Sequence, residues 1–266
     1  MKISANIIVK NESFFLPYTL ESIYKVVDEI LILDNGSDDD TIEKINIFKS
    51  KVDIPVHIYE NTSLDFAFLR NLLMEKSIGD WIFIADGDEV FYTDGKHSIL
   101  TIKEYLEKLH PSITAMWIQF YHFYGSFNHI INHVPHAARR FIKNGMGINW
   151  GYDIKDKLIH EVLKGDKLKL FNSPDYYYAH YGYCKSNKDI WLKGKNYYER
   201  GYPNGLYRPN DYPDWEQKIP SVLNGTEVSL FTGEHPQIMK DFDFNQYKVD
   251  LEKLENGNFK IKEKYW

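Results

Sequence analysis

Short apolar runs alternate with helical patterns along the first third of the chain, and this alternation constrains the fold more than any other feature of the sequence. The runs are typical of buried strands, whereas the intervening segments repeat apolar residues at helical spacing. The strand-like runs are residues 3–10, 29–33, 56–59 and 81–85, and the helical segments are residues 14–27, 42–48 and 64–76. This order predicts an α/β fold with a mostly parallel sheet, helices on its faces and a ligand site beyond the carboxyl ends of the strands.

An acidic turn follows the fourth predicted strand. Asp86, Asp88 and Glu89 lie within four positions, and Gly87 separates the two aspartates. Carboxylates this close together are costly to bury unless a cation meets them. Their oxygens suit Mg²⁺ and Mn²⁺, which leave coordination positions for substrate phosphates. The turn therefore predicts a metal site for a phosphorylated ligand, and the alternative is a solvated acidic turn.

Polar residues also follow the first two predicted strands. Asn11 and Glu12 come after the first strand, and Asp34 and Asn35 lie at the end of the second. The carboxyl ends of parallel strands meet at one edge of a sheet, so we expect these side chains to lie near Asp86.

Composition narrows the class of protein. The chain has 266 residues, a formal net charge of -6 and one cysteine, Cys184. The negative charge argues against a protein that binds nucleic acid by neutralising phosphates. A single cysteine allows no intrachain disulfide and fits a reducing compartment. No apolar run approaches the roughly 18 residues of a membrane-spanning helix. We therefore expect a cytoplasmic protein without an integral membrane segment, which could associate peripherally with the inner face of the membrane.

Aromatic residues are concentrated in the second half of the chain. Residues 116–124 predict an apolar, aromatic strand, and residues 125–136 and 145–152 are interpreted as loops. The first of these loops carries three histidines, which we interpret as part of an exposed acceptor-side loop because no cysteine or carboxylate stands at ligand spacing. The rings could pack against sugars or fill the core.

Two further segments combine apolar residues with titratable ones. His160 and Glu161 lie inside a short apolar run, where buried polar groups need partners. The pair is not part of an H-E-x-x-H motif, so a zinc protease is not indicated. His180 lies in an aromatic strand over residues 176–183, and a helix predicted over residues 188–198 presents Lys193.

Several of these features together resemble the family-2 glycosyltransferases of the GT-A fold. The matching motifs are Lys10-Asn11-Glu12 after the first strand, residues 34–41, Arg70-Asn71, Gly79-Asp80-Trp81 and Asp86-Gly87-Asp88. They cover about the first 95 residues in the family's order. A looser similarity, carried by His160-Glu161 and His180-Tyr181-Gly182-Tyr183, extends to about residue 200.

The resemblance implies a role for each matching residue. Residues that would contact the nucleotide-sugar are Lys10, Asn11, Glu12, Asp34, Asn35, Arg70 and Asp86. Asp86 and Asp88 would hold a Mn²⁺ or Mg²⁺ ion that bridges the diphosphate, and a histidine from the second half, His180, would complete its protein ligands. Glu161 would be the catalytic base, with His160 as the alternative. Apolar neighbours of Glu161 favour this choice because partial desolvation makes a carboxylate more basic.

The resulting hypothesis is a metal-dependent, inverting glycosyltransferase built as a single GT-A domain. Residues 1–115 would form a Rossmann-like half that binds the donor, with a UDP-sugar favoured, and residues 116–230 an acceptor-side half. The role of residues 231–266 is left open. The acceptor hydroxyl could belong to a glycan, a lipopolysaccharide, a protein or a modified nucleic acid. The alternatives are a sugar-phosphate nucleotidyltransferase, which usually needs a Gly-rich phosphate loop, and a non-catalytic carbohydrate-binding protein.

Overall fold

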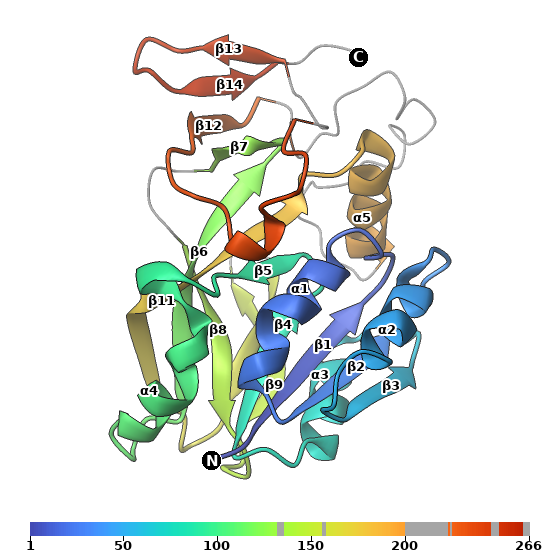
Figure 1. Ribbon diagram of the computed structural model, residues 1–266, viewed down its shortest axis with the longest axis vertical. Helices are drawn as coiled ribbons and strands as arrows, with labels where there is room; N and C mark the ends of the chain where they lie inside the picture. Colours follow the sequence, from blue (N-terminus) through green and yellow to red (C-terminus); the bar gives the residue numbers. More distant parts are fainter. Residues whose placement is uncertain (132–135, 156–157, 200–222, 224, 246–249, 263–266) are drawn as a thin grey trace.

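The computed structural model describes residues 1–131, 136–155, 158–199, 223, 225–245 and 250–262. A central mixed sheet runs through the molecule, with strand order β13-β14-β12-β7-β6-β8-β4-β1-β2-β3. Figure 1 shows the N-terminal elements around one end of this sheet and the C-terminal hairpin at the other.

The N-terminal end of the sheet is parallel, as the alternating sequence predicts. It consists of β1 (Ile3–Val9), β2 (Glu29–Asp34), β3 (Val56–Glu60) and β4 (Trp81–Asp86), and every neighbouring pair among them is parallel. The connecting helices are α1 (Leu16–Ile23) with the 3-10 turn η1 (Tyr24–Val26), α2 (Thr41–Lys49) and α3 (Phe66–Lys76). The register pairs Ile8 with Asp86 and Val9 with Asp34, which aligns the carboxyl ends of three strands. The predicted α/β class is therefore confirmed.

The C-terminal half extends this sheet with mostly antiparallel strands. Strand β8 (His136–Lys143) pairs with β4 and with β6 (Ala115–Tyr124), and β7 (Ser126–Ile130) follows. The long strand β11 (Leu170–Tyr183) runs parallel to β6 and antiparallel to the short β5 (Glu89–Phe91). β12 (Glu227–Leu230), β14 (Phe259–Ile261) and β13 (Leu251–Lys253) complete the order, and β9 (Asn149–Lys155) pairs separately with β10 (Leu158–Lys164).

Short helices connect these strands. Between β5 and β6 lie the 3-10 turns η2 (Gly95–His97) and η3 (Ile99–Thr101) and the helix α4 (Ile102–Lys108). Helix α5 (Asn187–Glu199) follows β11, and the 3-10 turn η5 (Gln237–Met239) follows β12. The helices predicted over residues 64–76 and 188–198 are thus present with shifted ends.

Two segments interpreted as loops contain strands. Residues 126–130 form β7, in which Phe127 is fully buried, and residues 149–155 form β9. The loop interpretation of residues 125–136 and 145–152 was therefore wrong for these parts, because burial of apolar side chains such as Phe127 and Trp150 outweighed the polar flanks. The histidine at position 133 lies outside the described residues.

The core has a layer on each face of the parallel strands. Ile3, Ala5 and Ile7 of β1 pack with α1 and α2, while Ile8 packs with α3 on the opposite face. The pair β9–β10 packs beside α3 against Ile82 and Ile84 of β4. This alternation follows from the two-residue period of a strand.

Aromatic side chains form a second core cluster where β6, β7 and β11 meet α1. Phe15, Phe123, Phe127 and Tyr181 are fully buried there, and Phe242 of the C-terminal segment packs onto them. Part of the unusual aromatic content therefore serves packing, as aromatic residues bury large apolar areas.

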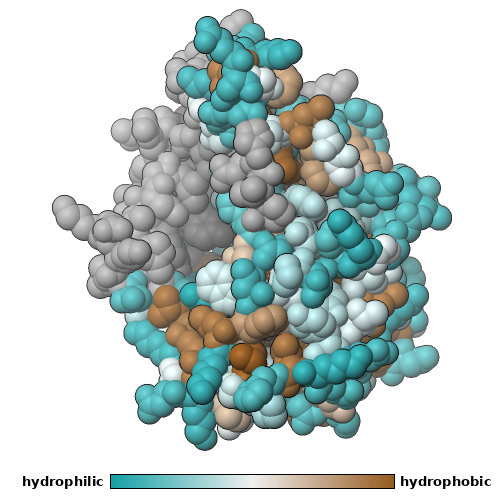
Figure 2. Space-filling model, turned by 90° about the vertical axis from the view of Figure 1, so that its left-hand side faces the viewer, coloured by the Kyte–Doolittle hydropathy of each residue, from teal (hydrophilic) through white to brown (hydrophobic). Residues whose placement is uncertain are grey.

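No helix among the described residues is long and apolar enough to cross a membrane. Figure 2 shows one face of the molecule, on which hydrophilic and intermediate side chains predominate and apolar ones gather in a band across the lower half.

Replacing Phe83 tests the packing at the centre of the sheet. Phe83 is fully buried in β4 and stacks on Phe141 of β8 with ring centroids 4.4 Å apart. We expect Phe83→Ala to lower the free energy of unfolding by about 3–5 kcal/mol, measured by urea denaturation, because it leaves a cavity. The control is Phe68→Ala, since Phe68 is 49% exposed on α3. Equal losses in the two variants would contradict the described core.

Candidate active site

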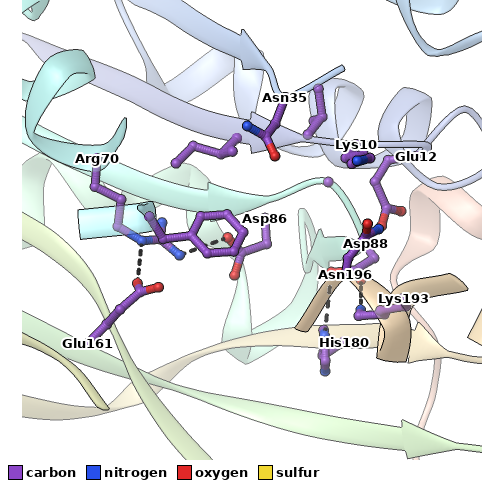
Figure 3. Close-up of a pocket in the computed structure, with 14 residues that line it drawn as sticks. Lys10, Glu12, Asn35, Arg70, Asp86, Asp88, Glu161, His180, Lys193 and Asn196 are labelled. Carbon is purple, nitrogen blue, oxygen red and sulfur yellow. Dashed lines mark hydrogen bonds and ion pairs between the residues drawn. The ribbon is translucent and has the colours of Figure 1, made fainter. Parts of the chain in front are cut away.

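A pocket of about 170 Å³ opens at the carboxyl ends of β1, β2 and β4. Its wall is completed by α3, β10, β11 and α5 (Figure 3). The residues that line it are Ile8, Val9, Lys10, Glu12, Asn35, Phe66, Arg70, Asp86, Gly87, Asp88, Glu161, His180, Lys193 and Asn196. Eight of the residues selected from the sequence are therefore brought together at one place.

The acidic turn enters the pocket because Gly87 allows a close approach to β1. A Cβ atom on Gly87 would lie 3.0 Å from Cβ of Glu12 and 3.2 Å from Cγ1 of Val9. Asp86 ends β4 and Glu89 begins β5, so the turn holds Asp88 between two strands. A side chain at position 87 would therefore require the side chains of Glu12 and Val9 to shift.

Asp88 is buried between two cationic groups from the second half of the chain. Its Oδ2 accepts a hydrogen bond from Lys193 Nζ at 2.7 Å, and its Oδ1 lies 3.4 Å from His180 Nε2. Burial by itself would raise the pKa of Asp88, but Lys193 and His180 outweigh it and hold the pKa well below the usual range. Gly182 leaves room for this contact, since a Cβ atom there would lie 2.5 Å from Asp88 Oδ2.

Asp86 faces two arginines. Its carboxylate oxygens lie 3.4 Å from the guanidinium of Arg70 on α3 and 3.4 Å from that of Arg140 on β8. Burial opposes ionisation, yet the two arginines lower the pKa of Asp86. Figure 3 shows this carboxylate directed toward Arg70, while Asp88 belongs to a separate group with His180 and Lys193.

Glu89 shares Arg140 with Asp86 but is more deeply buried. Its Oε1 contacts Arg140 NH2, and its Oε2 accepts a hydrogen bond from the backbone N–H of Asp86 at 3.1 Å. Burial raises the pKa of Glu89 to about 8; Arg140 opposes this shift, and the charges of Asp86 and Asp88 add to it. Arg140 therefore connects the carboxylates on either side of the turn.

Glu161 lies on the opposite wall of the pocket, on β10. Its Oε2 accepts a hydrogen bond from Arg70 Nε at 3.0 Å, and its side chain is 18% exposed. Arg70 also stacks over Trp150, with its Cζ 5.0 Å from the ring centroid. Arg70 thus holds Glu161 and Asp86 in fixed positions on either side of its guanidinium.

Glu12 forms an ion pair behind the acidic turn. Its Oε2 accepts a hydrogen bond from Lys185 Nζ at 2.5 Å. Burial raises the pKa of Glu12 to about 7; Lys185 opposes the shift and the charge of Asp88 reinforces it.

Three of the residues selected from the sequence, Asn11, Asp34 and His160, are not among the described residues that line the pocket. Asp34 is buried and accepts hydrogen bonds from the N–H groups of Gly36 and Ser37, so it shapes the turn after β2. Asn11 has a positive φ of 56° and donates to Asp38. The side chain of His160 lies outside the described residues. Their expected roles remain predictions.

Several lining or supporting residues were not selected as site residues from the sequence. Phe66, Asn196 and Lys193 line the pocket, and Arg140 and Lys185 hold its carboxylates. Lys193 was noted only as a basic residue presented by a helix. Its partner Asp88 lies 105 positions earlier, so no local pattern identifies the pair.

The residues that line the pocket provide some of the ligands that a divalent cation needs. Asp88 and His180 are adjacent and line the pocket, and Nδ1 of His180 is buried without a hydrogen bond within the described residues. Among those residues no group of three or more His, Cys, Asp or Glu side chains is arranged to hold a metal. Two protein ligands with phosphate and water oxygens suit Mg²⁺ or Mn²⁺, which are often bound through few protein groups.

A comparison with models of protein families identifies the family to which the chain belongs. The model of glycosyl transferase family 2 matches residues 4–147, which is more than half of the sequence. The chain therefore belongs to this family, and the resemblance drawn from its motifs is confirmed.

Individual relatives match a smaller part. Glycosyltransferase SunS of Bacillus phage SPbeta is 33% identical over 105 residues, which is 40% of this chain and 24% of that protein. An uncharacterized glycosyltransferase of Rickettsia felis is 31% identical over 88 residues, or 33% of this chain and 29% of the relative. The match thus spans less than a third of each relative's length.

Similar solved structures include a mannosyltransferase, PcManGT from Pyrobaculum calidifontis, determined with GDP-Man and Mn²⁺. It is 14% identical, with 80% of this chain and 68% of that chain covered and a TM-score of 0.48. TarS from S. aureus is 13% identical, with 73% and 38% covered and a TM-score of 0.46.

The raised pKa of Glu12 predicts a pH-dependent stability. The pKa of about 7 in the folded protein exceeds the ordinary value of 4.5, so the protonated carboxyl stabilises the fold at low pH and this contribution is lost as the pH rises through 7. Between pH 4.5 and 8 the wild type should lose about 3 kcal/mol more unfolding free energy than Glu12→Gln.

Urea denaturation over this pH range provides the measurement. Glu43→Gln, at an exposed position on α2, is the control and should follow the wild type. If Glu12→Gln has the same pH dependence as the control, the environment described for Glu12 is wrong.

Proposed function

We propose that the protein transfers a sugar from a nucleotide-sugar, with a UDP-sugar favoured, to an acceptor hydroxyl in a metal-dependent, inverting reaction. The observation that carries the proposal is the convergence of Asp88, His180 and Lys193 on one side of the pocket with Arg70 and Glu161 on the other. The side with Asp88, His180 and Lys193 suits a diphosphate bound together with a cation. The side with Arg70 and Glu161 offers a carboxylate for the acceptor hydroxyl.

The charges that line the pocket support a diphosphate ligand bound with a cation. Glu12, Asp86, Asp88 and Glu161 contribute four carboxylates, while the lining cations are Lys10, Arg70 and Lys193. A diphosphate adds negative charge to a nearly balanced site, so its binding requires further positive charge. We propose that Mn²⁺ or Mg²⁺ supplies it, held by Asp88 and His180 beside Asp86.

When bound, this cation would neutralise charge on the leaving nucleoside diphosphate. Lys193 would release Asp88 and turn its ammonium group toward the phosphates, since an ammonium is a flexible donor. Arg70 would contact the donor and keep Glu161 oriented. Lys10, Glu12 and Asn35 lie at the ends of β1 and β2 and would contact the nucleoside, with Asn11 and Asp34 shaping the same loops.

Glu161 is the proposed base. Inversion requires a group that takes the proton from the acceptor hydroxyl while the diphosphate leaves on the opposite side of the sugar. Glu161 lines the pocket across from Asp88, on a strand of the second half. His160, the neighbouring residue on β10, is the alternative.

The proposal divides one GT-A domain into a donor half, residues 1–115, and an acceptor half, residues 116–230. Acceptors compatible with this division are a glycan, a lipopolysaccharide, a protein or a modified nucleic acid. The single, buried cysteine supports a cytoplasmic location, and a lipid-linked acceptor would bring the protein to the inner face of the membrane.

Removal of either proposed metal ligand tests the metal site. Asp88→Asn keeps the volume but removes the anionic charge, so sugar transfer should fall by orders of magnitude, and His180→Ala should weaken Mn²⁺ binding by the folded protein. Nucleoside diphosphate release and calorimetric titration with Mn²⁺ provide the measurements. Asp53→Asn, at an exposed site, is the control. Full activity in EDTA, or of Asp88→Asn, would rule out the metal site.

Glu161→Gln tests the base. The variant keeps the shape and most hydrogen bonds of Glu161 but cannot accept a proton, so it should bind donor and Mn²⁺ normally and transfer sugar at least ~100-fold more slowly. Asp153→Asn, on the paired strand β9, is the matched control and should remain active. Near-native transfer by Glu161→Gln would reject this residue and direct attention to His160 and to residues 153–156.

A further inference from the structure

A second cavity, of about 320 Å³, lies outside the candidate active site. Its walls include four aromatic side chains: Tyr92 after β5, His97 of η2, Tyr121 of β6 and Phe231 after β12. The ring of Tyr121 lies 5.0 Å from that of Phe231 and 6.4 Å from that of Tyr92. The volume falls within the range of small-molecule sites, which are lined mainly by such side chains.

The C-terminal segment closes this cavity. The hydroxyl of Tyr92 donates a hydrogen bond to the backbone carbonyl of Glu234 at 2.8 Å, which fastens residues 231–236 beside β5 (Figure 1). His235 also lines the cavity, and it is held there by a 2.6 Å hydrogen bond between its Nδ1 and the hydroxyl of Tyr181. The cavity is therefore formed by parts of the fold that are held together by hydrogen bonds. One of its walls belongs to residues 231–236, which do not line the candidate active site.

Polar groups surround the aromatic walls. Asp94, Lys96 and Glu234 are exposed at the rim and form no ion pair within the described part of the chain. The hydroxyl of Tyr121 likewise makes no hydrogen bond to a described residue, and His97 uses only Nδ1, toward the carbonyl of Asp175 at 3.1 Å. Donors and acceptors are thus available around an apolar floor.

The two cavities are separate. On β6, Tyr121 lies opposite Ala179 of β11 while His122 lies opposite His180, so Tyr121 and His180 point to opposite faces of these strands. Tyr177, whose ring packs on His97 at 3.9 Å, precedes His180 by three residues, or about 10 Å along the strand. A ligand in the second cavity is too remote to react at the candidate active site.

We propose that this second cavity binds an uncharged saccharide unit. The C–H faces of a sugar ring pack on aromatic rings, and its hydroxyls need both donors and acceptors, which the rim supplies. Two carboxylates against one ammonium at the rim disfavour phosphate and other anions. The proposal concerns binding only and does not depend on the transfer reaction.

Saturation-transfer NMR with neutral hexasaccharides of glucose, mannose and N-acetylglucosamine tests this site. At about 10 mM sugar, which detects weak dissociation constants, at least one hexasaccharide should bind, and UDP with Mn²⁺ should not displace it. Failure of all three to bind, or displacement by UDP, would overturn the proposal. Tighter binding of glucose 6-phosphate than of any hexasaccharide would do the same.

Two conservative variants locate the binding. Tyr121→Phe removes only an unbonded hydroxyl, and Glu234→Gln retains the carbonyl that accepts from Tyr92, so both should fold. Each should weaken saccharide binding about tenfold, the scale of a lost hydrogen bond to a charged or well-placed group. Glu252→Gln, exposed on β13, is the matched control. If Tyr121→Phe and Glu234→Gln both bind the saccharide as tightly as the wild type, the sugar binds outside this cavity and the proposal is overturned.

Discussion

The buried carboxylates of the β4–β5 turn constrain the rest of this structure. Asp88 is almost fully buried, and an ionised group in such a position is strongly destabilising without partners. The partners come from distant segments: α3, β8, β11 and α5 contribute Arg70, Arg140, His180 and Lys193. The second half of the chain must therefore fold against the first for the turn to be stable, and the same contacts enclose the pocket.

The two aspartates of the acidic turn, Asp86 and Asp88, have different surroundings. Asp86 is held by two guanidinium groups, each through one nitrogen, whereas Asp88 contacts an ammonium and an imidazole. Arginine remains charged and fixed, but lysine is flexible and histidine is a common metal ligand. The positions of Asp86 and Glu161 are therefore set by the fold through Arg70, while the surroundings of Asp88 can rearrange when a charged ligand arrives. This difference supports separate roles in positioning and in ligand binding.

Aromatic residues serve two purposes in this structure. Phe15, Phe127 and Tyr181 form a buried cluster with Phe242, whereas Tyr92 and Tyr121 line the second cavity. A sequence rich in aromatic residues is compatible with either use, and only the tertiary structure shows which rings line a cavity. The C-terminal segment links both, because it contributes Phe231, Phe242 and Phe244 to the cluster and one wall to the cavity.

The sequence by itself determined the α/β class, the parallel strands and the clustering of polar residues at their carboxyl ends. These follow from local periodicity and turn chemistry, which act over a few residues. It also selected Asp88, Glu161 and His180, which line the pocket, but not what they contact. The tertiary structure alone decided that Arg70 meets Glu161, 91 positions away, and that Lys193 meets Asp88. Such pairs depend on strand register and on the packing of helices against the sheet, and these in turn result from burial summed over the whole chain.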